Sequence, residues 1–208
     1  DTGFLNEDLF KFDLDDLARK YKKKGYLDFK VLDVERKIDD EYINLIIYIE
    51  EGEPYIIKSI STKWLNIPGK EDDKYLFSEE DIRPLIDSEP GFIYNLEIEE
   101  KDIGRMEAKY NNLGYLKFRC NTQLKSNQET REVDVEYQIY EGTPSVIRDI
   151  KIVGNTITRD YVIRRELALH PTDLANKLLI DKSKNRLLGL GYFNEVDILD
   201  SDTGIDGE

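Results

Sequence analysis

The residue types that carry most enzyme chemistry are scarce in this chain. It has one histidine, His170, and one cysteine, Cys120, so neither a histidine-based triad nor a His/Cys metal set can be assembled. Its 44 Asp and Glu residues make chance carboxylate pairs unavoidable, and no pair stands out as an acid–base couple. We therefore predict that the chain is not an enzyme and has no catalytic residue, no metal site and no cofactor.

Two short segments are similar to ligand-binding loops. Gly189-Leu190-Gly191 lacks the third glycine of a dinucleotide loop and follows a helical pattern, so we interpret it as a helix end. Residues 200–206 are similar to a calcium loop, but the glycine falls one position early, and the given sequence ends before position twelve, where such a loop has its glutamate. A hairpin turn is the favoured interpretation of that segment.

The charge distribution limits the classes of partner. A net charge of −14 argues against nucleic acid as the main partner, because phosphate binding needs a basic surface. The one basic run, Arg19 to Lys24, follows Asp13, Asp15 and Asp16 in a helical pattern, and this order opposes the helix dipole at both ends. A nucleic-acid or lipid patch is the less favoured alternative for the run. No stretch approaches the roughly 20 apolar residues of a membrane helix.

A helical pattern that ends in glycine and tyrosine occurs three times, at Gly25-Tyr26, Gly114-Tyr115 and Gly191-Tyr192. The positions 4, 8 and 11 before each glycine are apolar or aromatic in eight of nine cases, with Ser183 as the exception. Because this spacing marks one helix face, we predict that the eight side chains face their own module's sheet. They are Leu14, Leu17, Tyr21, Ile103, Met106, Tyr110, Ile180 and Leu187. We also predict positive φ for Gly25, Gly114 and Gly191 as structural helix caps.

Each of the first two glycines precedes two strand-like segments. Residues 132–139 alternate between polar and apolar, and residues 42–49 nearly do so, which predicts hairpins with one buried face. In the third copy, a strand is expected at 146–153 and a helix from the cap Thr158 to about Leu169.

A second motif repeats 90 residues further along: Glu51-Gly52-Glu53-Pro54 and Glu141-Gly142-Thr143-Pro144. Each copy leads directly from one strand into the next, so Gly52, Pro54, Gly142 and Pro144 are predicted links between modules. Links this short restrict the angles between modules, unlike a Gly/Ser tether. The predicted organisation is the second half of a module in residues 1–52, a complete module in 53–142, and a module without its last strand in 143–208.

The strand-helix-helix-strand-strand order, the Gly-Tyr helix end and the Glu-Gly-x-Pro link resemble polypeptide-transport-associated (POTRA) domains. The closest match lies in the third copy, at residues 146–156, 162–167 and 185–196. The resemblance implies an α+β fold of tandem POTRA modules, each with a three-stranded mixed sheet covered by two helices. Ser183 departs from the pattern, as does an insertion at 64–73.

The resemblance also implies a function. It identifies a periplasmic scaffold at the bacterial outer membrane, which receives unfolded outer-membrane β-barrel precursors by strand addition and docks accessory lipoproteins of an assembly complex. A membrane barrel is expected downstream. In POTRA domains the edge that binds polypeptide resembles the strand after each Gly-Tyr; the candidate residues are Tyr26, Asp28, Lys30, Tyr115, Lys117, Arg119, Asn121, Tyr192 and Asn194.

Two other functions remain open from the sequence. One is the POTRA arm of a sister transporter of the two-partner secretion or translocation-assembly type. The other is a surface protein built from unrelated α+β repeats.

Overall fold

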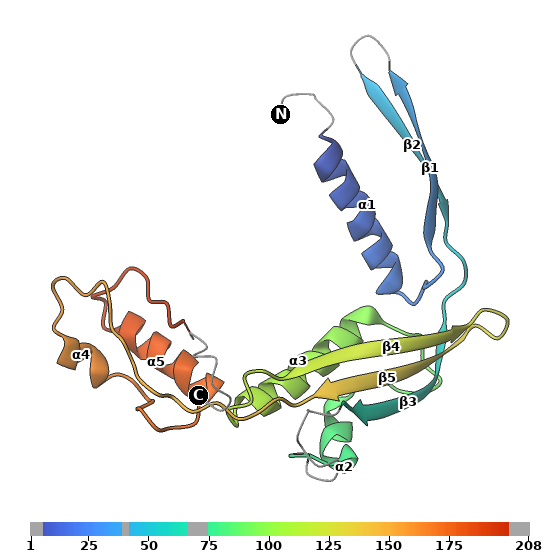
Figure 1. Cartoon of the computed structure of the whole chain (residues 1–208). Helices are drawn as coiled ribbons and strands as arrows, with labels where there is room; N and C mark the ends of the chain where they lie inside the picture. The colour runs from blue at the N-terminus through green and yellow to red at the C-terminus, as the bar shows by residue number, and fades with distance from the viewer. Residues whose placement is uncertain (1–5, 39–41, 66–74, 200–208) are drawn as a thin grey trace. The chain divides into compact units, whose positions relative to one another are not determined.

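The computed structural model describes residues 6–38, 42–65 and 75–199. The strands form two sheets, one with the order β1-β2 and one with the order β3-β5-β4. The α+β class predicted from the sequence is therefore confirmed. In chain order, and as labelled in Figure 1, the elements are α1 (Glu7–Lys22), β1 (Lys30–Ile38), β2 (Ile43–Glu50), β3 (Ile56–Trp64), α2 (Glu79–Ile82), the 3-10 helix η1 (Arg83–Leu85), α3 (Leu96–Asn111), β4 (Arg119–Asn127), β5 (Glu132–Tyr140), α4 (Asp160–Arg164) and α5 (Lys177–Gly189).

The chain divides into two compact units, each made of three segments. The first comprises 1–62, 84–102 and 122–137, and the second comprises 63–83, 103–121 and 138–208. Each unit therefore contains part of the predicted central module. The module boundaries near residues 52 and 142 stay a prediction.

Helix α1 of the first unit is longer than the sequence pattern indicates. It begins at Glu7, where the Asn6 side chain accepts hydrogen bonds from the backbone N–H groups of residues 8 and 9. The predicted start near Asp13 is therefore wrong, because the stronger cap lies two turns earlier. The end of the helix agrees with the prediction, since Lys20 and Lys22 occupy its last turn. This position agrees with the favoured explanation of the basic run, because cations at the C-terminal end of a helix interact favourably with its dipole.

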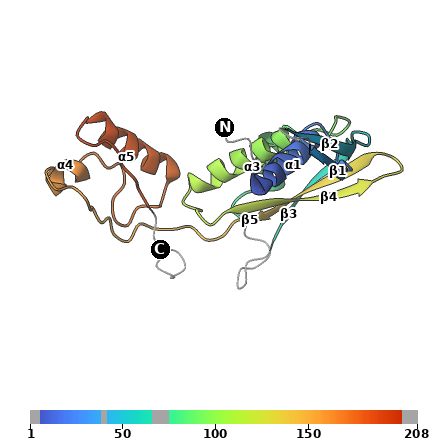
Figure 2. The ribbon, with the colours of Figure 1, turned by 90° about the horizontal axis from the view of Figure 1, so that it is seen from above.

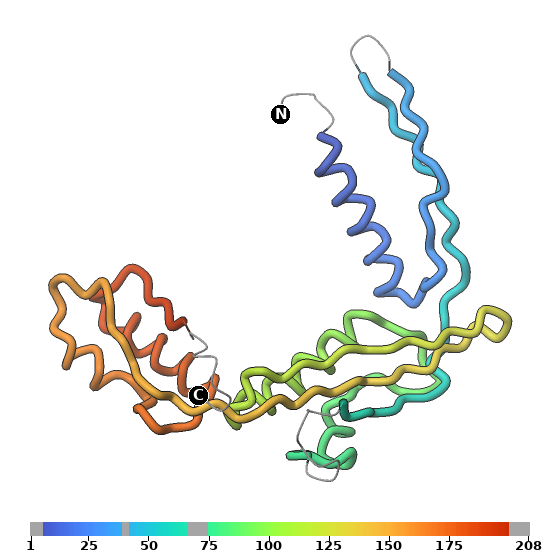
Figure 3. Tube along the Cα trace, viewed as in Figure 1, coloured from blue at the N-terminus to red at the C-terminus, as the bar shows by residue number. Residues whose placement is uncertain are grey.

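The predicted hairpin at the first copy is present. Strands β1 and β2 pair antiparallel from Lys30 opposite Glu50 to Ile38 opposite Ile43, with a bulge between Val31 and Asp33 (Figure 3). The predicted buried face of β2 is wrong, because its isoleucines remain between 36% and 42% exposed. The described sheet here has only two strands, and α1, which lies beside it in Figure 1, contains no fully buried residue.

The predicted alternation is confirmed in β5, the middle strand of the second sheet. Val133, Val135, Tyr137 and Ile139 are at most 1% exposed, while the intervening residues are half-buried. Figure 2 shows α3 over one face of this sheet. Of the eight residues predicted to face a sheet, Met106, Tyr110 and Leu187 are buried and the other five are half-buried. No described strand lies in the third copy for Ile180 and Leu187 to face, and for the other six the contact with a sheet stays a prediction.

The third copy departs from prediction most. Between residues 143 and 199 the structure contains no strand; only an isolated bridge pairs Val146 with Leu174. The strands predicted at 146–153 and after Tyr192 are therefore wrong, because a strand needs a continuous hydrogen-bonded neighbour. Helix α4 is also shorter than predicted and follows Arg159, which makes no side-chain cap.

Ser183, the one exception to the apolar pattern, is 1% exposed and hydrogen-bonded through both functions of its hydroxyl. The hydroxyl donates to the Leu179 carbonyl at 2.7 Å and accepts from the Ala168 N–H at 2.8 Å. In the central copy, the corresponding loop amide, that of Asp87, donates to the buried Asp102 carboxylate at 2.9 Å. A side chain of α3 and a side chain of α5 thus accept from equivalent loop N–H groups. Counted back from the helix-end glycines, Asp102 lies one turn before the position that corresponds to Ser183.

The second and third copies repeat one backbone hydrogen-bond pattern. Ile57 donates to the Phe92 carbonyl and accepts from Gly91, each at 2.8 Å. Ile147 donates to the Asp173 carbonyl at 2.8 Å and accepts from Thr172 at 2.7 Å. Gly91 and Thr172 therefore occupy equivalent positions, and both have positive φ, at 88° and 79°.

We expect the substitution Thr172→Gly to stabilise the third copy by about 1 kcal/mol. A β-branched residue is strained in the left-handed region, and glycine relieves this strain. Thermal unfolding of the two proteins measures the effect. Gly91→Thr is the matched reverse change and should destabilise the central copy, although the space around that Cβ is open. An unchanged melting temperature for both variants would contradict the argument.

Candidate functional site

Most of the candidate polypeptide-binding residues lie outside the strands of the structure. Strand β1 begins at Lys30 and β4 at Arg119. Of the nine candidates, only these two and Asn121 lie in a strand; Tyr26, Asp28, Tyr115, Lys117, Tyr192 and Asn194 do not. Their part in binding stays a prediction.

After α1 and after α3 the chain makes a turn before it extends into a strand. In the central copy, the Tyr115 N–H donates to the Tyr110 carbonyl at 3.1 Å and the Leu116 N–H donates to the Gly114 carbonyl at 3.0 Å. Tyr26 and Leu27 make the same two bonds in the first copy. Gly25 and Gly114 have φ of 89° and 87°, and Gly191 has φ of 68°, so the predicted positive φ is confirmed.

Strand β4 is the best-formed candidate edge. It stands at one end of the sheet order, with β5 as its neighbour. Arg119, Asn121 and Gln123 are exposed, while Cys120 and Thr122 between them are half-buried. One face of β4 therefore meets the core and the other meets solvent.

A tyrosine and a glutamate connect each of the first two helices to the following Glu-Gly-x-Pro motif. The Tyr21 hydroxyl donates to Glu51 at 2.5 Å, and the Tyr110 hydroxyl donates to Glu141 at 2.8 Å. The pKa of the Tyr21 hydroxyl is raised mainly by this bond, whereas the pKa of Tyr110 is raised mainly by burial and then by Glu141. The spacing of both motifs was visible in the sequence, but their contact was not.

Aromatic rings surround both tyrosines in the same way. Tyr21 stacks on Phe29 with centroids 4.1 Å apart, and Tyr110 stacks on Phe118 at 4.4 Å. The tyrosine after each glycine approaches edge-on, at 5.7 Å and 6.0 Å. In the first two copies, the tyrosine of the Gly-Tyr motif therefore belongs to a cluster of three aromatic rings.

Each motif glycine permits a close approach to the turn after the helix. A Cβ on Gly52, whose φ is 72°, would lie 3.3 Å from the Asp28 Cβ. A Cβ on Gly142, whose φ is 71°, would lie 3.1 Å from the Lys117 Cβ. The role of Gly52, Gly142 and the following prolines as module links stays a prediction.

A polar cluster follows the first link, inside the first unit. Asp28 accepts hydrogen bonds from the Tyr55 hydroxyl at 2.7 Å, from Arg131 at 2.5 Å and from Gln128 at 3.3 Å. The bond from Tyr55 lowers the pKa of Asp28, although burial opposes that shift. Burial is the main cause that raises the pKa of Tyr55, which is 0% exposed. No sequence pattern indicated this cluster, whose members are up to 103 residues apart.

The second link uses the same backbone bond with different side chains. The Ser145 N–H donates to the Gly114 carbonyl at 2.8 Å, as the Tyr55 N–H does to the Gly25 carbonyl at 2.9 Å. Here Lys117 and Ser145 replace Asp28 and Tyr55. The Asn176 side chain instead donates to the Asn112 carbonyl at 2.6 Å.

The single histidine and the single cysteine lie in different segments of the structure. His170 is exposed and lies 3.6 Å from Asp173, and Cys120 is half-buried in β4. No group of three potential metal ligands occurs in residues 6–38, 42–65 and 75–199. No described helix is both long and apolar enough to cross a bilayer. Most of the 64–73 insertion, and the whole 200–206 segment, lie outside the described residues.

Comparison with known proteins decides the family. Residues 66–142 and 145–206 match the POTRA family, described as a surface antigen variable number repeat. The chain belongs to the POTRA family. This membership excludes the alternative of unrelated α+β repeats.

Curated relatives of this POTRA chain include two proteins named outer membrane protein assembly factor BamA. The one from Neorickettsia risticii is 27% identical over 99% of this chain, and the one from Neisseria meningitidis serogroup B is 27% identical over 92%. This chain covers 26% and 23% of those proteins. It thus spans about a quarter of the length of the curated relatives it matches.

The fold of the POTRA modules also matches solved structures. The crystal structure of Haemophilus influenzae BamA POTRA3-5 superposes with a TM-score of 0.75 at 20% identity, covering 95% of this chain and 76% of that one. A BamA structure from Haemophilus ducreyi that lacks POTRA domains 1-3 gives a TM-score of 0.51 at 14% identity, over 69% of this chain and 25% of that one. The predicted fold of tandem POTRA modules is therefore confirmed.

Proposed function

We propose that this chain is a periplasmic binding scaffold, and not an enzyme, in outer-membrane protein assembly. It receives unfolded β-barrel precursors by strand addition and docks accessory lipoproteins, at the periplasmic face of the bacterial outer membrane. The names of the BamA relatives support the assembly role. The position of β4 at an edge of the sheet supports the mechanism, since a strand edge is a template for another chain.

Strand addition suits a scaffold that handles many sequences. Main-chain hydrogen bonds supply the affinity, and side-chain contacts add only preference. The solvent-facing side chains of β4, such as Arg119 and Asn121, are polar, which keeps the free edge soluble. A precursor strand with alternating apolar residues would extend the existing sheet.

Asn121→Pro tests this mechanism, because proline removes a ladder N–H from β4. We expect the substitution to weaken binding of a ten-residue peptide taken from a barrel strand by about fivefold or more, while Asn121→Ala leaves binding nearly unchanged. Binding is measured by NMR titration of residues 1–208, after circular dichroism confirms that each variant is folded.

Hydrogen exchange on the unmodified chain gives a second readout that does not depend on the proline variant. Edge pairing should slow the exchange of every second amide between residues 119 and 127, since alternate amides point away from β5. Uniform slowing, or slowing confined to α3, would exclude strand addition at β4.

A further inference from the structure

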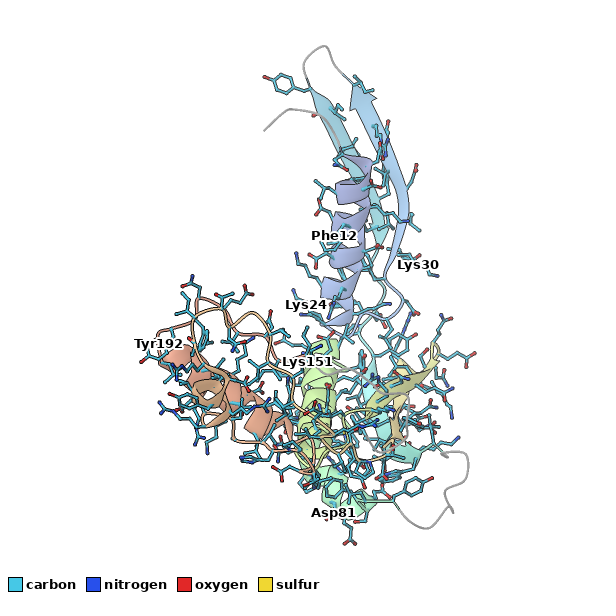
Figure 4. All side chains as sticks on the ribbon, turned by 60° about the vertical axis from the view of Figure 1, so that its left-hand side comes forward. Phe12, Lys24, Lys30, Asp81, Lys151 and Tyr192 are labelled. Atoms are coloured by element: carbon cyan, nitrogen blue, oxygen red, sulfur yellow. The ribbon has the colours of Figure 1, made fainter. Side chains whose placement is uncertain are left out.

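A surface hollow of about 460 Å³ lies in the first unit, between the end of α1 and the loop before α3. Ile57 and Tyr94 form part of its apolar lining and are each 3% exposed. Phe92 also lines it but is 64% exposed. Lys23 and Lys24, the two residues that follow α1, also line it, and Figure 4 labels Lys24 just beyond the end of that helix. One hollow thus has an exposed phenyl ring and two lysines in its lining, and this combination could bind a ligand with apolar and anionic groups.

The backbone that carries Phe92 is held firmly. The Phe92 carbonyl accepts from the Ile57 N–H at 2.8 Å, and the Gly91 N–H before it donates to the Ile57 carbonyl at 2.8 Å. The Tyr94 N–H after it donates to the Tyr55 carbonyl at 2.9 Å. A ring on a fixed backbone loses little further entropy when a partner covers it.

The third copy shows that the fold does not require this ring. Asp173 occupies the position equivalent to Phe92 and makes the same 2.8 Å backbone bond, to Ile147. Counting back from the helix-end glycines, Lys23 and Lys24 correspond to Asn112 and Leu113. The ring and the two lysines therefore occur together at the first link alone, and structural need does not explain their combination.

We propose that this hollow binds an acidic segment of a partner protein that carries a large aromatic or aliphatic side chain. The apolar side chain would contact Phe92 and Ile57, and the carboxylates would lie beside Lys23 and Lys24. With a net charge of −14, most of the surface repels an acidic segment, so the lysines would determine where it docks. Asp87 and Glu89 also line the hollow and would exclude carboxylates from their side.

The same features make other partners less suitable. A lipid headgroup layer is flat, whereas this site is concave and has acidic residues in its lining. Nucleic acid needs a broad basic surface, and the chain is acidic overall. A polypeptide segment can enter the hollow with its carboxylates on the side of Lys23 and Lys24 and away from Asp87 and Glu89.

The test uses residues 1–208 and a labelled peptide with three aspartates beside a Trp-Leu pair, measured by fluorescence polarisation. Phe92→Asp introduces the residue type that the third copy carries at this position, so the fold should tolerate it. We expect at least about a tenfold loss of affinity, as for an aromatic anchor in an interface. The double variant Lys23→Glu, Lys24→Glu should lose a similar factor and should instead prefer a peptide in which lysines replace the aspartates.

Phe12→Asp and Lys182→Glu are matched controls, because both positions are exposed and line no part of the hollow. Each should bind the peptide as the parent chain does. The proposal would be overturned if the Phe92 variant and the double lysine variant bound the acidic peptide as tightly as the parent chain does. It would also be overturned if the double lysine variant had equal affinity for the acidic peptide and the lysine peptide. Phe92-dependent binding to phosphatidylglycerol vesicles without peptide binding would overturn it as well. Asn121→Pro should leave peptide binding at the hollow unchanged. A failure of this proposal can therefore be told apart from a failure of strand addition at β4.

Discussion

Replacing Glu141 by alanine is expected to lower the free energy of unfolding by about 3–5 kcal/mol. The Glu141 side chain is 0% exposed and accepts hydrogen bonds from the Leu76 N–H, at 2.9 and 3.1 Å, and from the Tyr110 hydroxyl. The substitution leaves both donors without this acceptor and opens a cavity beside them. Bonds to a charged group are stronger than neutral ones, so the loss is a large part of a typical stability of about 5–15 kcal/mol.

Trp64 offers a local readout for this variant. It is the only tryptophan in the chain and lies 5.7 Å from the Tyr75 ring, close in sequence to Leu76. Urea unfolding followed by its fluorescence therefore reports on the part of the second unit that Glu141 holds together.

Glu51→Ala is the matched control, since Glu51 has the same position in the first motif and also accepts from a tyrosine. Glu51 is exposed, so its loss should cost at most about 1 kcal/mol. Glu141→Gln should fall between the two because the amide keeps an acceptor but loses the charge. Equal costs for Glu51→Ala and Glu141→Ala would show that burial does not set the strength of this contact.

Glu141 illustrates which features the sequence could and could not predict. The 90-residue spacing identified its motif, and helical periodicity identified Tyr110, so both residues were singled out. Their contact joins positions 31 apart, and the contact with Leu76 joins positions 65 apart. A local pattern contains no information about such pairings, so the motif was interpreted only as a link.

Ser183 and the third copy show the opposite limits. The helical face was predicted correctly, but the polar residue on it was treated as a departure, because its partner, the Ala168 amide, belongs to a loop 15 residues away. The strands of the third copy were predicted from their positions in the repeat, after the Glu-Gly-x-Pro motif and after Gly-Tyr. Pairing with a neighbouring strand decides whether such segments become strands, and residue type does not encode it.

The edge-strand residues were misplaced for a local reason. The sequence pattern assigned a strand directly after Gly-Tyr, whereas the backbone first makes the turn seen at Tyr26 and Tyr115. Phe29 and Phe118, which lie between Gly-Tyr and the strand, stack on Tyr21 and Tyr110. Residues of these types are common in strands, but here they pack in the core before the strand begins.

Gly25→Ala is expected to destabilise the first unit by about 2–4 kcal/mol, the larger part from crowding. A Cβ at this position would lie 2.5 Å from the Ile93 Cγ2 and 2.9 Å from the Tyr94 carbonyl oxygen. The Tyr94 segment is held by its bond to Tyr55, so the backbone oxygen cannot move aside at low cost. Overpacking of this kind typically costs about 1–3 kcal/mol, and the left-handed φ of 89° adds about 1 kcal/mol.

The other two helix-end glycines separate these two contributions. Among the described residues, no atom lies within 4 Å of the position that a Cβ on Gly191 would take, so Gly191→Ala should cost only the conformational part, about 1 kcal/mol. Gly114→Ala should fall between them, because its nearest neighbours are the Ser145 carbonyl at 3.3 Å and Leu174 at 3.4 Å. Thermal unfolding of the three variants should rank them in the order Gly25, Gly114, Gly191. Equal shifts would mean that φ alone sets the cost and that the first link is not tightly packed against its helix end.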